Sequence, residues 1–221
     1  MKTSDTLLDG DPWFADLTAV QRAAVLREAT PMTARAGRRI YRCGDAGDGL
    51  YAVLEGTVRL AVQPKIGREI TNLVLGRGDW FGELSLLDGQ PRPHDAVAEA
   101  DCRLLFVSQG RWMRLTGEDG HLWPALARLT ARRHRQALTH LGRLLAQSPF
   151  ARLAGVLLEL ATSDGAVRLS QDALATLVGV TRQTLNPLLR RMEEGRLIQR
   201  SYGCVSVRDR EGLMQLSKDR S

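Results

Sequence analysis

Two segments of this 221-residue chain carry charged and polar side chains at spacings suited to anion binding. In the first, FGELSLLDGQPR at residues 81–92, a Gly-Glu-Leu triplet is followed, nine residues after the glutamate, by an arginine. A glycine-bounded turn offers backbone N–H groups, Arg92 offers a bidentate guanidinium to a phosphate, and Glu83 accepts a hydrogen bond from a ribose hydroxyl. Together these groups suit a ribose phosphate.

The second segment, LSQDALATLVGVTRQTLNPLLRRMEEGRLI at residues 169–198, has the spacing of a helix-turn-helix. Ala175 is small where two helices cross closely, and Gly179 tolerates the positive φ of the turn. Leu185 is apolar where the second helix faces inward. Ser170 is a residue type that caps the first helix. This segment is predicted to enter the major groove of DNA.

The second helix carries the side chains expected to contact DNA. With Thr181 as its N-cap, the free N–H groups behind it suit a phosphate, while Arg182 and Gln183 extend toward base edges. Arginine pairs with guanine and glutamine with adenine, each good pair contributing ~1–3 kcal/mol of discrimination. The predicted DNA-binding residues are Ser170, Gln171, Thr181, Arg182, Gln183, Thr184, Asn186, Arg190, Arg200 and Tyr202.

A hairpin is predicted to follow this helix. LIQRSYGCVSV at residues 197–207 alternates polar and apolar residues on both sides of Tyr202 and Gly203, which makes the domain a winged helix. The wing offers Arg200 and Tyr202 to a phosphate backbone. The alternative is a winged helix that binds protein and makes no contact with DNA.

Pro187 is an unusual residue inside the predicted recognition helix. Counted from Thr181 as the cap, it is the sixth helical residue, so the carbonyl of Gln183 loses its hydrogen bond. An interior proline costs about 3 kcal/mol in a regular helix. Because it lies less than two turns from the helix start, the expected result is a bend.

The elements that position these segments follow from glycine and apolar patterns. Residues 31–107 alternate short apolar stretches with glycines, which predicts an antiparallel barrel or sandwich. Within it, residues 50–62 predict two strands around a tight turn at Glu55 and Gly56. A short helix over 17–28, capped by Asp16 or Thr18, precedes the strands, and Pro149 begins a helix that runs to about Ala161.

A long helix is predicted over residues 120–147. Its apolar residues form a seam that is interrupted near Arg133 and consists of Leu122, Leu126, Leu129, Ala137, Leu141 and Leu144. The seam favours pairing with the same helix of a second copy. The alternative is that it packs on the chain's own barrel.

The net charge of +6 is unevenly distributed. Residues 1–119 carry a net charge of −2, residues 120–149 hold five arginines and no acid, and residues 150–221 carry +3. This distribution favours a polyanionic partner for the second half, or a solvated basic helix face.

Other classes of protein are disfavoured. The chain has no run of roughly eighteen apolar residues and no signal-peptide pattern, which predicts a cytoplasmic protein without a membrane partner. Its three cysteines are isolated in the sequence, and this spacing argues against a disulfide scaffold, a zinc finger or an iron–sulfur site. No nucleophile–base pair or metal-ligand spacing indicates an enzyme, and the isolated histidines do not favour haem.

A glycine-rich β-roll, a long basic helix and a C-terminal winged helix in this order resemble the Crp/Fnr superfamily of bacterial transcription regulators over nearly the whole chain. The resemblance implies an α+β fold with a cyclic-nucleotide-binding-like antiparallel β-roll (1–118), a dimerisation helix (119–147) and a winged helix-turn-helix (148–221). It also implies a sequence-specific homodimer on a palindromic promoter site, regulated at the β-roll, with RNA polymerase as a further partner.

Residues 81–92 are similar to the phosphate-binding cassette of cyclic-nucleotide-binding domains. The resemblance implies a ligand site formed by Gly82, Glu83, Leu84, Arg92, Pro93 and Thr139. Three features depart from the family pattern: Pro93 has no N–H to give the phosphate, Ala137 and Leu138 replace an adenine-contacting Thr-Ser pair, and Thr139 is one residue out of register. Two alternatives stay open: a cAMP-like cofactor, or a cassette that is empty or differently liganded, with Glu83 and Arg92 paired to each other.

Overall fold

The computed structural model describes residues 8, 11–62, 69–162, 164–201 and 203–218. The chain separates into two units. The first, called here the N-terminal unit, consists of Met1–Glu69 and Leu73–Arg135, and the second, the C-terminal unit, consists of Ile70–Asn72 and Gln136–Ser221. Each unit has its own core.

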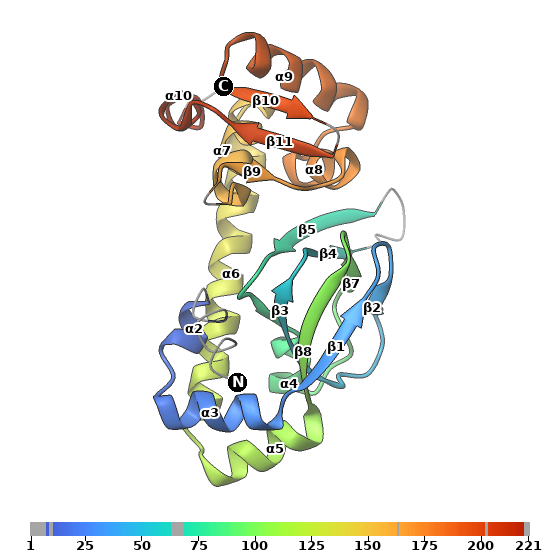
Figure 1. Ribbon diagram of the computed structural model, residues 1–221, viewed down its shortest axis with the longest axis vertical. Helices are drawn as coiled ribbons and strands as arrows, with labels where there is room; N and C mark the ends of the chain where they lie inside the picture. Colours follow the sequence, from blue (N-terminus) through green and yellow to red (C-terminus); the bar gives the residue numbers. More distant parts are fainter. Residues whose placement is uncertain (1–7, 9–10, 63–68, 163, 202, 219–221) are drawn as a thin grey trace. The chain divides into compact units, whose positions relative to one another are not determined.

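The glycine-punctuated segment forms two sheets, as the sequence predicts (Figure 1). Their strand orders are β1-β8-β3-β6 and β2-β7-β4-β5. The described strands are β1 Thr30–Ala34, β2 Arg39–Tyr41, β3 Gly49–Glu55, β4 Val58–Val62, β5 Ile70–Leu75, β6 Trp80–Phe81, β7 Asp95–Ala98 and β8 Cys102–Ser108. Pairs such as β1 with β8 and β4 with β7 are antiparallel, and Tyr51, Phe81 and Leu104 are buried in the core that the strands form.

Strands β3 and β4 are consecutive but do not form a hairpin. The two strands predicted over 50–62 are present, yet β3 pairs with β6 and β8 while β4 pairs with β7. At Gly56, between them, φ is 88°, and a Cβ there would lie 2.5 Å from the carbonyl oxygen of Asp101. Glycine is therefore required where the chain crosses from one sheet to the other. The expected tight turn is a corner between sheets.

Short helices complete the N-terminal unit. They are α2 Pro12–Ala15, α3 Ala19–Glu28, α4 Glu83–Asp88 and α5 Gln109–Glu118. Of the two residues expected to cap α3, Thr18 does so, through a capping box with Gln21. Trp13, Phe14 and Trp80 pack against one another with ring centroids 5.1–6.0 Å apart, which attaches α2 to β6.

The long helix, α6, spans Leu122–Ala146. The sequence predicts that its leucines form one seam, but in the structure they form a buried group and an exposed group. Leu122, Leu126 and Leu129 are buried in the core of the N-terminal unit, so this part packs on the chain's own β-roll. Farther along, the exposed apolar stripe is made of Leu138, Leu141 and Leu145, which are 54%, 51% and 81% exposed. None of the described helices is both long and apolar enough for a membrane crossing.

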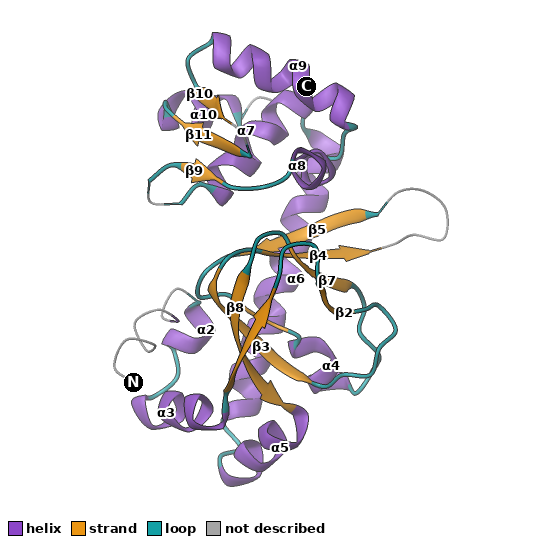
Figure 2. Ribbon diagram, turned by 45° about the vertical axis from the view of Figure 1, so that its right-hand side comes forward, coloured by secondary structure: helices purple, strands orange, loops and turns teal. Residues whose placement is uncertain are grey.

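The described residues of the C-terminal unit form the helices α7 to α10 and a three-stranded sheet of order β10-β11-β9 (Figure 2). Its elements are α7 Pro149–Leu160, β9 Ala166–Val167, α8 Gln171–Val178, α9 Arg182–Glu194, β10 Ile198–Ser201, β11 Cys204–Val207 and α10 Arg210–Leu216. Pro149 is the first residue of α7 and Ser148 caps it, as predicted. Antiparallel β10 and β11 form the expected hairpin.

Candidate functional site

The turn between α8 and α9 has the geometry of a helix-turn-helix. The Ser170 hydroxyl caps α8 by accepting a hydrogen bond from the backbone N–H of Ala173 (3.2 Å). Gly179 ends α8 with a φ of 73°, in the left-handed region that favours glycine. Ala175 and Leu185 are buried at the positions where the motif needs a small and an apolar residue. The sequence prediction of this motif is confirmed.

The exposed face of α9 carries the polar side chains predicted for DNA. Thr181 caps the helix by accepting a hydrogen bond from the N–H of Thr184 (3.2 Å). The predicted residues on the open face are Arg182, Gln183, Thr184 and Arg190, which are exposed, and Asn186, which is half-buried. Pro187 is also exposed, and α9 is continuous through it. A row of donors and acceptors therefore faces solvent along one helix.

Arg182 is held by the preceding helix. Its Nε donates to Oε1 of Gln171 (3.1 Å), and its Nη1 lies 3.7 Å from Oδ2 of Asp172. The Arg182 side chain is 58% exposed, so these contacts orient the guanidinium without covering it. Gln171, a predicted DNA-contacting residue, is thereby brought next to the residue expected to contact bases.

The wing is attached to α9 by Arg200. Its backbone N–H donates to Oε1 of Glu193 (2.8 Å) and its Nε to Oε2 (2.9 Å). These hydrogen bonds hold the pKa of the Glu193 carboxyl below its usual range. Arg200 is thus engaged within the unit through its backbone N–H and its Nε. Tyr202, the other predicted wing contact, lies outside the described residues.

In the N-terminal unit, the predicted cassette forms a helix between two left-handed glycines. Gly82 (φ 91°) precedes α4 and Gly89 (φ 68°) follows it. A Cβ on Gly82 would lie 2.8 Å from the carbonyl oxygen of Gly49 and 2.9 Å from Nη1 of Arg92. Only glycine fits this close approach.

The guanidinium of Arg92 is enclosed by its own unit. Nη1 donates to the carbonyl of Gly82 (2.8 Å), and Nη2 donates to the carbonyl of Gly49 (2.8 Å) and to Oδ1 of Asp48 (2.5 Å). The ring of Tyr41 stacks on it, with the guanidinium carbon 4.4 Å from the ring centroid. The ion-pair partner of Arg92 is Asp48, so the expected pairing with Glu83 is wrong. The aspartate was missed because it lies 44 residues away in the sequence.

The other predicted ligand residues have different surroundings. Glu83 is buried, and desolvation raises the pKa of its carboxyl, although Arg133 and Arg92 oppose the shift. Gly82, Glu83 and Arg92 are thus brought together, whereas Leu84 and Pro93 are exposed. Thr139 is an exposed residue of α6.

Several buried polar atoms around the cassette have no hydrogen-bond partner among the described residues. They are Oγ of Ser85, Nε of Arg92, Nδ1 of His94 and the hydroxyl of Tyr41. Burial lowers the pKa of His94 to about 4, so its imidazole is neutral at pH 7. Unpaired buried polar atoms are costly, and a polar ligand or water would relieve that cost. The region retains capacity for hydrogen bonding.

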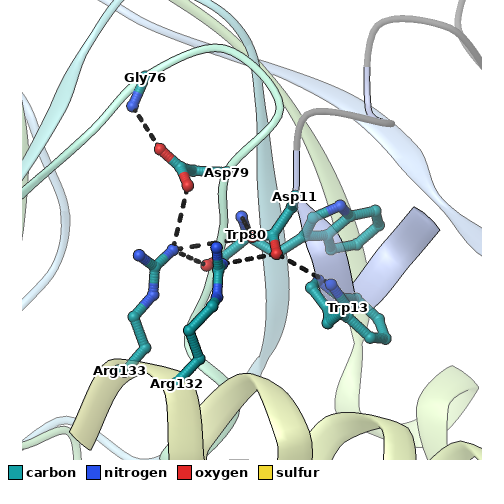
Figure 3. Close-up of polar contacts among 7 residues, drawn as sticks. All are labelled: Asp11, Trp13, Gly76, Asp79, Trp80, Arg132 and Arg133. Atoms are coloured by element: carbon teal, nitrogen blue, oxygen red, sulfur yellow. Dashed lines mark hydrogen bonds and ion pairs between the residues drawn. The ribbon is translucent and has the colours of Figure 1, made fainter. Parts of the chain in front are cut away.

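Arg132 and Arg133 connect α6 to the strand that leads into the cassette (Figure 3). Arg133 donates to the carbonyl of Trp80 (3.0 Å) and to Oδ1 of Asp79 (3.3 Å). The buried carboxylate of Asp11 accepts hydrogen bonds from Arg132 (2.5 Å) and from the N–H of Trp80 (3.2 Å). Desolvation raises the pKa of Asp11, and both arginines oppose that shift. The interruption of the predicted seam at Arg133 is an ion-pair site.

Comparison with known proteins matches both units. Residues 31–119 match the cyclic nucleotide-binding domain family, and residues 151–216 match the Crp-like helix-turn-helix domain. The chain is 33% identical over 183 residues to the cyclic AMP receptor protein of Thermus thermophilus, covering 82% of this chain and 85% of the relative.

Solved structures share the fold. FixK2 from Bradyrhizobium japonicum superimposes with a TM-score of 0.80 at 23% identity, covering 87% of this chain and 99% of that protein. A CRP/FNR-family transcriptional regulator from Thermus thermophilus has a TM-score of 0.72 at 29% identity, over 87% of this chain and all of the other.

Proposed function

The chain belongs to the Crp/Fnr family of transcription regulators, and from this premise we propose that it binds an inverted-repeat promoter site through Arg182, Gln183 and Asn186 of α9. As a member of that family it is a DNA-binding regulator. The observation that carries the choice of residues is the open polar face of α9, capped by Thr181 and supported on buried Leu185.

The chemistry of this face supports direct contact with base edges. The Arg182 guanidinium is exposed and already oriented by Gln171, so less freedom is lost when it binds guanine O6 and N7. Gln183 offers the amide that pairs with adenine. Pro187 has no donor side chain, so base contacts shift toward the residues before it. The N-terminal N–H groups of α9 suit a phosphate.

We infer a homodimer that pairs through α6. Leu138, Leu141 and Leu145 follow one another at steps of three and four residues and are more than half exposed, which is the pattern of a helix-pairing stripe. A two-fold dimer would present two copies of α9 to half-sites about 34 Å apart. Family membership alone supports RNA polymerase as a further partner and the cytoplasm as the place of action.

Selection from a randomised duplex library tests the proposal. Wild-type protein is expected to enrich an inverted repeat, and Arg182→Ala is expected to lose ~1–3 kcal/mol of discrimination at one base pair of each half-site. Arg168→Ala is the matched control, because Arg168 is 62% exposed and lies outside the helix-turn-helix. Enrichment of no repeat, or an unchanged motif in Arg182→Ala, would overturn the proposal.

We propose further that a ligand of the β-roll competes with Asp48 for Arg92. This is supported by the ion pair between them and by the unpaired polar atoms of Ser85 and His94 nearby. Calorimetry with cyclic AMP and cyclic GMP tests it. Heat of binding that disappears in Arg92→Gln is the expected result. If neither nucleotide gives heat while DNA binding persists, regulation by a cyclic nucleotide is excluded.

A further inference from the structure

We propose that Arg152 of α7 is a positioning residue that fixes the helix-turn-helix to the end of α6 and thereby sets the spacing of the two half-sites. The inference rests on the proposed dimer through α6. All contacts that carry it lie within the C-terminal unit.

One guanidinium connects the ends of two helices. Nη1 of Arg152 donates to the carbonyls of Leu144 (3.3 Å) and Gln147 (2.6 Å), at the end of α6. Its Nε donates to the carbonyl of Val178 (2.8 Å), the last residue of α8. Carbonyls at helix C-termini lack partners within the helix and carry partial negative charge, so an arginine is favoured there. Arg152 therefore bridges the end of α6 to the last residue of α8, directly before the DNA-binding turn.

Packing reinforces the same joint. A Cβ on Gly179 would lie 2.6 Å from Cδ2 of Leu144, so this leucine lies directly on the turn between α8 and α9. The α6 side of the joint is also held by an ion pair from Arg143 to Glu159 (2.6 Å) and by a hydrogen bond from Gln147 Nε2 to the carbonyl of Ser217 (2.7 Å).

The joint adjoins the stripe assigned to dimerisation. Leu144 packs on the turn, while the next residue, Leu145, is 81% exposed. A dimer contact at Leu145 would therefore act on the neighbouring residue Leu144, which packs on the turn before α9. The three hydrogen bonds of Arg152 connect the same end of α6 to the last residue of α8. A rigid connection holds two copies of α9 at one separation, and a loose one accepts several separations.

The experiment measures affinity for inverted repeats whose spacer is changed one base pair at a time. The half-site is the one selected by wild-type protein, and a duplex with a single half-site measures binding without spacing. Wild type is expected to prefer one spacer by at least about tenfold over its neighbours. Arg152→Met keeps an unbranched apolar side chain in place of the arginine's methylene stem and removes every donor. It is expected to reduce that preference to about twofold while single-half-site affinity is unchanged.

Two results would overturn the inference. One is a wild-type spacing profile in Arg152→Met, and the other is a proportional loss of affinity for all duplexes, single half-site included, which would make Arg152 structural only. If the methionine variant does not fold, Arg152→Lys decides, because its compact ammonium keeps the charge but lacks the fork whose separate nitrogens, Nε and Nη1, donate to the two helices. The lysine variant is then expected to show the same reduced preference among spacers, and a wild-type spacing profile overturns the inference.

Arg168→Gln is the control for loss of charge, because Arg168 pairs with Asp164 and is not among the residues of the joint. Its spacing profile should match that of wild type. Failure of the proposed function is recognised separately, since wild type itself would then enrich no inverted repeat.

Discussion

Arg92 and Arg182 are arginines predicted from short motifs to bind a phosphate and a DNA base edge, and their surroundings in the structure are opposite. Arg92 has a side chain that is 1% exposed, with donors directed at two carbonyls and at Asp48. Arg182 is 58% exposed and is oriented by Gln171 and Asp172, which leave it open to solvent. One guanidinium is enclosed by the protein, and the other is presented to a partner.

A sequence motif therefore determines the local backbone but does not determine whether its functional group is accessible to a partner. Gly82 permits the close approach that brings Arg92 inward, and Gly179 makes the turn that places Arg182 outward. The counter-charge of Arg92 is Asp48, on a loop distant in sequence.

The largest effect is expected for Arg92→Gln on stability. It leaves the carbonyls of Gly82 and Gly49 without a charged donor, and should lower the free energy of unfolding by about 3 kcal/mol. Urea unfolding followed by tryptophan emission reports on the right unit, because all four tryptophans lie in residues 1–135. Arg182→Gln is the matched control and should unfold like wild type. Equal stability of the two variants would contradict a stabilising role for the buried Arg92 guanidinium.

A nearly equal effect is expected from acid, acting through His94. Its pKa is about 4 in the folded state against 6.5 when exposed, so the stability it contributes is complete above pH 6.5 and is lost as pH falls toward 4. The loss reaches about 3 kcal/mol over that window. His94→Gln should remove this part of the pH dependence of urea unfolding, measured by tryptophan emission. An identical pH dependence in variant and wild type would refute it.

A smaller effect is expected for Pro187→Arg on DNA specificity. The substitution adds a guanidinium to the exposed face of α9 and restores a backbone N–H for the carbonyl of Gln183. The motif selected from a random library should change at one base pair per half-site, by ~1–3 kcal/mol. Leu188→Met, one residue farther along the helix and half-buried, should leave the motif unaltered. If Pro187→Arg selects the wild-type motif, Pro187 does not influence specificity.

The smallest effect is expected for Asp48→Asn. Removing the carboxylate charge frees Arg92 for an anionic ligand, and the affinity for cyclic AMP should rise by about tenfold, or ~1.4 kcal/mol. Asp45→Asn, in the same loop, is the control. Titration calorimetry that gives the same affinity for both variants would show that Asp48 does not compete with the ligand.

The helix-turn-helix was predictable from sequence because its determinants are local. Ser170, Gly179 and Thr181 act within a few residues of their own positions, through caps and a left-handed turn. The start of α7 at Pro149 and the cap of α3 by Thr18 follow the same rule. The strands were predictable as elements because apolar residues alternate with glycines.

Contacts between residues that are distant in the sequence could not be predicted from it and are known from the tertiary structure. Strands β3 and β4 belong to different sheets: β3 lies between β6 and β8, and β4 lies between β5 and β7. The leucines of α6 divide into a group buried in the core of the N-terminal unit and an exposed stripe that belongs to the C-terminal unit. Arg92 turns inward because Asp48, 44 residues away, supplies its counter-charge. Spacing along the chain determines local geometry, whereas burial and charge pairing depend on which surfaces meet when the chain folds.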